Sequence, residues 1–229
     1  MNLITRYKSE DFHSINIMRF LPNTIYNIVL SDIVPSDVFI TKELAERLFT
    51  FFKESRLFRW QDANNDCEDR ANAICMLLDE WKLPNYKGWV FSGSFITKEG
   101  GSLINNWKYH VATIVPVQEG NEINFYVIDP ATLEIPDTIL NWASNITDLP
   151  FCHYLIKWNH YYIFPEKNIQ RDNWHEKNRQ NYKWTIQGLS GINGVSKVGK
   201  AQICFNKARI KKTEENFKYL LKNKPDFLL

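Results

Sequence analysis

The chain has 229 residues, of which 44% are hydrophobic and 24% are charged, and its formal net charge is +2. A chain of this length can bury one substantial core, because domains of roughly 100 to 200 residues are typical. The small net charge gives no support for nucleic acid as a partner. The four cysteines are widely spaced without a CxxC pair, which argues against a disulfide-stapled miniprotein and against a structural zinc site.

Residues 1–36 are interpreted as an N-terminal extension. Short apolar clusters lie between Pro22 and Pro35, a pattern typical of a short strand or irregular packing rather than of a long helix. Charged residues interrupt this segment, so we expect neither a classical signal peptide nor a membrane span.

The first predicted helix follows Thr41, whose hydroxyl can cap a helix N-terminus, and ends near Ser55. Charged residues take one face, and the other carries apolar side chains at offsets 0, 4, 7 and 8, namely Leu44, Leu48, Phe51 and Phe52. This spacing predicts a helix with one face in the core.

A second helix is expected to begin at Asp66 or Cys67, after several residues of helix-capping types, and to stop before Pro84. Its apolar stripe consists of Ala71, Ile74, Cys75, Leu78 and Trp81. Cys67 then lies in the first helical turn, where unpaired amide groups and the helix dipole favour a thiolate. Cys75 is expected to be a packing residue.

Strands are predicted at 89–91, 109–117 and 123–129, with a hairpin turn at 119–121. In the second of these strands the side chains alternate, so that His110 lies on the face opposite to Tyr109 and Val111. His110 begins this strand and Asp129 ends its antiparallel neighbour. Because the two outer ends of a hairpin are adjacent, we expect His110 and Asp129 to lie close together.

Cys67, His110 and Asp129 are, in this order, a candidate nucleophile, base and orienting residue. An ordinary thiol is only a few per cent thiolate at neutral pH, so a neighbouring imidazole must activate it. Structural interpretations stay open for each residue: a buried apolar cysteine, a core histidine with satisfied nitrogens, and an aspartate that ends a strand before Pro130.

Five short motifs in the same order resemble the bacterial protein-glutaminases, which are protein-glutamine deamidases with a Cys-His-Asp triad on a core similar to that of transglutaminases and papain. The motifs are Phe58-Arg59-Trp60, Cys67-Glu68-Asp69-Arg70-Ala71, Val90-Phe91, Trp107-Lys108-Tyr109-His110-Val111-Ala112 and Ile128-Asp129-Pro130. The resemblance implies an α+β cysteine hydrolase, with the nucleophile at a helix N-terminus that packs on an antiparallel sheet carrying His and Asp. It also implies a catalytic domain at 37–191. The tail at 192–229 has no counterpart in that family; its many basic residues and its apolar stripe of Phe217, Leu220 and Leu221 predict a helical, basic C-terminal tail.

This resemblance implies hydrolysis of glutamine side-chain amides in proteins or peptides to glutamate and ammonia through a cysteine thioester, with no metal and no cofactor. The alternatives are a transglutaminase-like acyltransferase, a cysteine protease, and a binding module without catalytic activity. The expected partner is a protein or peptide with an accessible glutamine; the oligomeric state is left open. The absent signal peptide favours a cytoplasmic protein, or an effector exported without one.

Further site residues are expected around this triad. The tetrahedral oxyanion needs preorganised donors, for which the candidates are the Cys67 backbone N–H, Gln61 and the indole N–H of Trp60. The candidates for substrate binding are Phe91, Ser92, Trp107 and Tyr109.

Overall fold

The structure is a computed structural model that describes residues 18–21, 24–26, 38–61, 67–92, 103–104, 107, 109–146, 152–159, 179–192 and 200–229. The helix-capping residues that the sequence predicts just before Cys67, at 62–66, lie outside these ranges.

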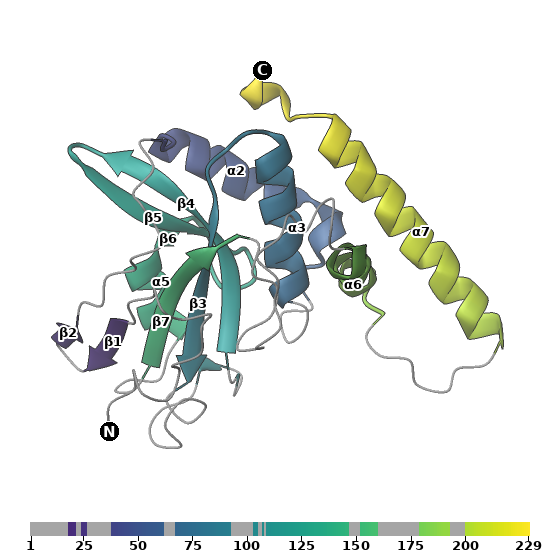
Figure 1. Ribbon diagram of the computed structural model, residues 1–229, viewed down its shortest axis with the longest axis horizontal. Helices are drawn as coiled ribbons and strands as arrows, with labels where there is room; N and C mark the ends of the chain where they lie inside the picture. Colours follow the sequence, from purple (N-terminus) through teal and green to yellow (C-terminus); the bar gives the residue numbers. More distant parts are fainter. Residues whose placement is uncertain are drawn as a thin grey trace.

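The fold is α+β, as the sequence predicts, and is built on a sheet of antiparallel pairs in the order β2-β1-β7-β3-β4-β5-β6 (Figure 1). The strands are β1 (Met18–Leu21), β2 (Thr24–Tyr26), β3 (Tyr86–Ser92), β4 (Tyr109–Glu119), β5 (Glu122–Ile128), β6 (Asp137–Thr138) and β7 (Cys152–Trp158). The helices are α2 (Lys42–Glu54), α3 (Cys67–Glu80), α5 (Ile139–Ile146), α6 (Arg179–Leu189) and α7 (Lys200–Lys222), with short 3-10 turns at η2 (Arg56–Phe58) and η4 (Asp226–Leu228).

Helix α2 forms where its capping residue predicts. The Leu44 N–H donates to Thr41 Oγ1 at 3.2 Å, and Ser55 caps the C-terminal end by donating its N–H to the Phe52 carbonyl at 3.2 Å. Ala45, Leu48, Phe49 and Phe52 are buried, while Phe51 packs at the edge of the core. The buried face is therefore rotated slightly from the predicted stripe.

Helix α3 begins at Cys67, one of the two predicted starting positions, and ends before Pro84. The five residues of the predicted stripe are all buried, and burial extends beyond the stripe to every residue from Asp69 to Leu78. The sheet covers one side of the helix, and α6 and α7 pack against others (Figure 1). The first turn of α3 is thereby fixed on several sides.

Two apolar clusters lie on opposite faces of the sheet because side chains alternate along β4. Val115 and Val117 pack into the cluster that contains α2 and α3, whereas Ala112 and Ile114 pack into the cluster that contains α5. Both faces of β4 are buried as a result.

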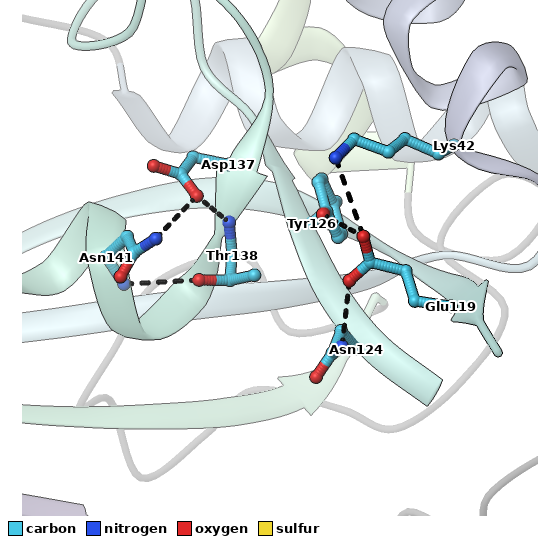
Figure 2. A network of polar contacts seen from close by, with 7 residues as sticks. All are labelled: Lys42, Glu119, Asn124, Tyr126, Asp137, Thr138 and Asn141. Carbon is cyan, nitrogen blue, oxygen red and sulfur yellow. Dashed lines mark hydrogen bonds and ion pairs between the residues drawn. The ribbon is translucent and has the colours of Figure 1, made fainter. Parts of the chain in front are cut away.

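A polar network ties the start of α2 to the far end of the β4–β5 hairpin (Figure 2). Glu119 accepts from Tyr126 Oη at 2.8 Å and from Asn124 Nδ2 at 2.9 Å, and it lies 3.5 Å from Lys42 Nζ. The turn itself places Gly120 at a φ of 62°, a conformation that glycine adopts without strain. The hairpin is thus held in the register that brings Thr113 opposite Ile128.

The C-terminal segment is helical over α7, and the second half of this helix enters the core. Phe217 is fully buried, and Leu220 and Leu221 pack against the same cluster as α2 and α3. Trp81 Nε1 donates to the Leu220 carbonyl at 3.3 Å. Among the described residues, none of the helices combines the length and apolarity needed to cross a membrane.

Candidate active site

The best-defined feature of the candidate site is a buried pair formed by His110 and Asp129. His110 Nε2 lies 2.8 Å from Asp129 Oδ2, and the two residues are only 1% and 4% exposed. His110 is the second residue of β4, and Asp129 directly follows β5. The predicted proximity of these residues is therefore confirmed, and its cause is the hairpin register.

Further hydrogen bonds fix the Asp129 carboxylate. The Thr132 hydroxyl donates to Asp129 Oδ2, and Trp142 Nε1 in turn donates to Thr132 Oγ1 at 2.9 Å. Burial acts to raise the pKa of Asp129, but His110, Thr132 and Arg70 together outweigh it and hold this pKa below its usual value. Asp129 is consequently held as an anion, and its carboxylate can accept a hydrogen bond from the Nε2–H of His110.

Aromatic rings enclose the imidazole. The Trp107 ring stacks on His110 with 4.6 Å between centroids and 17° between planes, and the Trp142 ring lies 5.8 Å away. The ring orientation of His110 is therefore set by packing as well as by Asp129.

Cys67 is the first residue of α3 and is partly exposed. Its side chain lines a narrow pocket together with Trp60, Arg70, Val111 and Asp129. The β4–β5 ladder begins at Thr113 and Ile128, so the first residues of β4 are not paired with β5 beside this pocket. Cys67 and Asp129 thus line the same pocket, beside the unpaired start of β4.

The sulfur does not contact the imidazole in this arrangement. The Cys67 thiol donates to Glu68 Oε2 at 3.3 Å, and no hydrogen bond joins it to the described His110 ring. Burial, and next the Glu68 carboxylate, raise the pKa of the Cys67 thiol well above its usual value, while Arg70 and the Val111 backbone N–H oppose them. The thiolate that the helix N-terminus was expected to favour is therefore not the resting state.

Side-chain alternation explains this separation. The ring of His110 faces the α5 side with Trp142, whereas its neighbour Tyr109 faces α3 and donates its hydroxyl proton to Glu68 Oε1. The Glu68–Tyr109 contact was not predicted from the sequence. One signal was present, because each of these residues adjoins a triad candidate in the chain.

Of the oxyanion candidates, Trp60 is contradicted as a donor. Its indole Nε1 donates to the Phe52 carbonyl at 2.7 Å, so this N–H satisfies the end of α2 instead. Its ring lies 5.6 Å from the Arg70 guanidinium. Gln61 is exposed beside it, and the Cys67 backbone N–H lies in the first turn of α3; both stay predictions as donors.

Three of the substrate-binding candidates lie on strands β3 and β4, and Trp107 lies before β4. Phe91 lies opposite Tyr109 in the β3–β4 register, and Ser92 ends β3. Trp107 covers the face of His110, and Tyr109 contacts Glu68. These contacts place Trp107 and Tyr109 beside the candidate residues, and a role of all four in binding stays a prediction.

Behind the site, a second buried polar network joins α3 to β3 and α6. Lys87 Nζ donates to Asn72 Oδ1, and Asn72 Nδ2 donates to Thr185 Oγ1 at 3.3 Å. Cys75 is fully buried, as expected for a packing residue, and its sulfur lies 3.5 Å from Thr113 Oγ1. Within the described ranges, no group of three or more His, Cys, Asp or Glu side chains is placed to hold a metal ion.

Comparison with known families identifies one matching segment. Residues 45–146 match a family model described as glutaminase, and this range contains Cys67, His110 and Asp129. The match runs from α2 to the end of α5 and stops before β7. Comparisons with curated proteins and with solved structures found no match.

Proposed function

From the match of residues 45–146 to the glutaminase family model, we propose that this protein is a protein-glutamine deamidase with Cys67, His110 and Asp129 as its catalytic residues. The family match itself supports a deamidase-like hydrolysis of amides. The observation that carries the finer proposal is the buried His110–Asp129 hydrogen bond beside the pocket that Cys67 lines.

The proposed mechanism begins with the tautomer of His110. A carboxylate that accepts from Nε2–H leaves the lone pair of Nδ1 available as a base. Nδ1 takes the thiol proton of Cys67, and the thiolate attacks the carboxamide carbon of a glutamine side chain. The C–S bond forms as the C=O double bond opens to an oxyanion.

The remaining steps return the enzyme to its starting state. The tetrahedral intermediate collapses, the C–N bond breaks, and the imidazolium of His110 gives its proton to the leaving ammonia. Water, deprotonated by His110, then attacks the thioester, and the C–S bond breaks to release glutamate and the thiol. The Cys67 backbone N–H at the start of α3 is the first proposed oxyanion donor, and Gln61 is the second.

The resting contact of Cys67 sets one requirement on this mechanism. The sulfur must exchange the Glu68 carboxylate for the His110 ring before it can lose its proton. A side chain that rotates about its Cα–Cβ bond moves between discrete staggered positions, so a rotamer change of Cys67 can bring about this exchange.

The test is ammonia release from a carboxybenzyl-Gln-Gly dipeptide and from casein, with glutamate formation read by mass spectrometry. We expect activity in the wild type, loss of it in Cys67→Ala, and retention in the matched control Cys204→Ala, which changes an exposed thiol of α7. Equal ammonia release by wild type and Cys67→Ala would contradict the proposal.

Other outcomes assign the site to one of its rivals. Incorporation of a fluorescent amine in place of water identifies an acyltransferase, and backbone cleavage identifies a protease. Binding of glutamine peptides without turnover, equally strong in wild type and Cys67→Ala, identifies a binding module. Each of these results overturns the deamidase assignment.

A further inference from the structure

A carboxylate bridges the nucleophile helix and the strand that carries the base. Glu68 Oε2 accepts from the Cys67 thiol at 3.3 Å, and Glu68 Oε1 accepts from the Tyr109 hydroxyl. An acidic residue in the first turn of a helix is ordinary, because it complements the helix dipole. The dipole does not explain why both oxygens of this carboxylate are engaged by residues next to the proposed catalytic groups.

We propose that Glu68 and Tyr109 form a latch that holds the Cys67 thiol on the α3 side of β4, away from His110, until a substrate displaces it. The latch rests on the proposed function, in which Cys67 must reach His110. Glu68 and Tyr109 are positioning residues in this scheme, because they act through the orientation and protonation of the sulfur.

The geometry of β4 gives the latch its direction. Tyr109 and His110 are consecutive, so their side chains leave the strand on opposite faces. Tyr109 reaches the first turn of α3, whereas His110 reaches Asp129 and Trp142. A sulfur that is bound to the Tyr109–Glu68 pair therefore points to the wrong side of β4 for proton transfer to His110.

Charged and polar groups around the sulfur shift its pKa in opposite directions, and Glu68 is the one that favours the protonated thiol. From α3, Glu68 raises the pKa of the Cys67 thiol and Arg70 lowers it; from β4, the Val111 N–H lowers it. Asp129 lines the same pocket, and Lys87 on β3 interacts electrostatically with Glu68. Burial raises the pKa of this thiol most and is unchanged when the Glu68 charge is removed, but that removal takes away the second cause and leaves Arg70 and the Val111 N–H acting in favour of the thiolate. The latch can therefore be tested through thiol reactivity.

The experiment measures the rate of Cys67 alkylation by iodoacetamide as a function of pH, with peptides resolved by mass spectrometry. Alkylation follows the thiolate fraction, and one pKa unit corresponds to a tenfold change in that fraction. We expect alkylation near neutral pH to be about tenfold faster in Glu68→Gln, with the pH profile displaced to lower pH. Tyr109→Phe, which keeps the ring, is expected to change the rate in the same direction by a smaller factor.

Glu80→Gln is the matched control, because it makes the same substitution at an exposed position of the same helix, and its rate should equal that of the wild type. Exposed Cys204 reports any change in reagent conditions within each sample. Circular dichroism verifies that each variant is folded. The latch is overturned if Glu68→Gln leaves the Cys67 rate unchanged or slows it, and the role of Tyr109 is overturned if Tyr109→Phe does so.

Failure of the latch and failure of the proposed function give different results. Alkylation needs no substrate, so it reports on the latch even if no variant releases ammonia. If Cys67→Ala abolishes ammonia release while Glu68→Gln alkylates at the wild-type rate, the deamidase stands and the latch fails. If Glu68→Gln is alkylated faster but neither the wild type nor any variant releases ammonia, the contact that holds the thiol is supported and the deamidase assignment fails.

Discussion

The tautomer of His110 is the residue-scale property on which the proposed chemistry depends. Asp129 holds it through a single hydrogen bond of 2.8 Å, inside a shell of aromatic rings that excludes competing partners from the imidazole faces. Such an orienting residue makes two contributions: an acceptor oxygen for Nε2–H, which holds the tautomer, and a charge that stabilises the imidazolium once this has formed.

Two substitutions of Asp129 separate these contributions. Asp129→Asn keeps an acceptor oxygen at nearly the same volume, whereas Asp129→Ala removes it and leaves a cavity. We expect Asp129→Ala to lower kcat for ammonia release by on the order of 10² or more, and Asp129→Asn to lower it by a smaller factor. Steady-state kinetics on the dipeptide measures both, and equal losses in the two variants would show that charge, not orientation, is the contribution that matters.

Individual residues also show where sequence reasoning succeeds and fails. The His110–Asp129 pair was predictable because a hairpin fixes which strand ends meet. The engagement of Glu68 by Tyr109 was not, because this contact joins segments that are distant in the chain and whose relative placement depends on the whole fold. The engagement of Trp60 by the Phe52 carbonyl depends on how the chain turns after α2. Local pattern therefore located the proposed site, and tertiary contacts determined the state of its sulfur.

Among the elements, α6 packs closely against α3, the helix that begins at Cys67. Gly188 of α6 lies against the Asp69 side chain in the first turns of α3, at a distance that leaves no space for a Cβ. Gly191, at a φ of 65°, lies similarly against Arg59. The boundaries of α2 and α3 followed from capping residues and Pro84, whereas the docking of α6 on α3 has no local signal in the sequence.

Gly188→Ala tests this close approach. In an exposed helix the change stabilises by about 1 kcal/mol, because alanine has the higher helix propensity. Here the added methyl group displaces Asp69, so we expect a net loss of about 1 to 3 kcal/mol in the free energy of unfolding. Urea unfolding measures this difference, and amide hydrogen exchange shows whether α6 has loosened from α3. Lys183→Ala at an exposed position of α6 is the control, and a stabilised Gly188→Ala protein would refute the close contact.

At the scale of the whole molecule, the helix that carries Cys67 also covers a buried charge. Lys87 is fully buried between β3 and α3, and burial lowers its pKa from 10.5 to about 8. Its ammonium group donates to Asn72, which in turn binds Thr185 of α6. Composition and periodicity could not reveal this residue, because a lysine between Tyr86 and Gly88 looks like an ordinary solvent-facing position of a strand.

This buried lysine makes stability depend on pH in a defined direction. The pKa in the folded state, about 8, lies below the ordinary value of 10.5, so the unfolded chain binds more protons between these two values. The free energy of unfolding should therefore rise as pH rises from about 8 to 10.5, and this gain in stability should be lost again as pH falls towards 8. The difference between the two pKa values corresponds to a change of about 3 kcal/mol in the free energy of unfolding.

Lys87→Met removes the titrating group at similar volume and isolates this effect from other groups that titrate at alkaline pH. Urea unfolding of both proteins at about pH 7 and about pH 10 gives four free energies of unfolding. We expect wild type to gain more stability than Lys87→Met between these two conditions, while Lys183→Met, which removes an exposed lysine, should follow the wild type. Parallel pH profiles for wild type and Lys87→Met would show that Lys87 keeps its ordinary pKa in the folded protein. Its ammonium group would then have to be stabilised by the α3 carboxylates that interact with it, Glu68, Asp69 and Asp79, strongly enough to offset its burial.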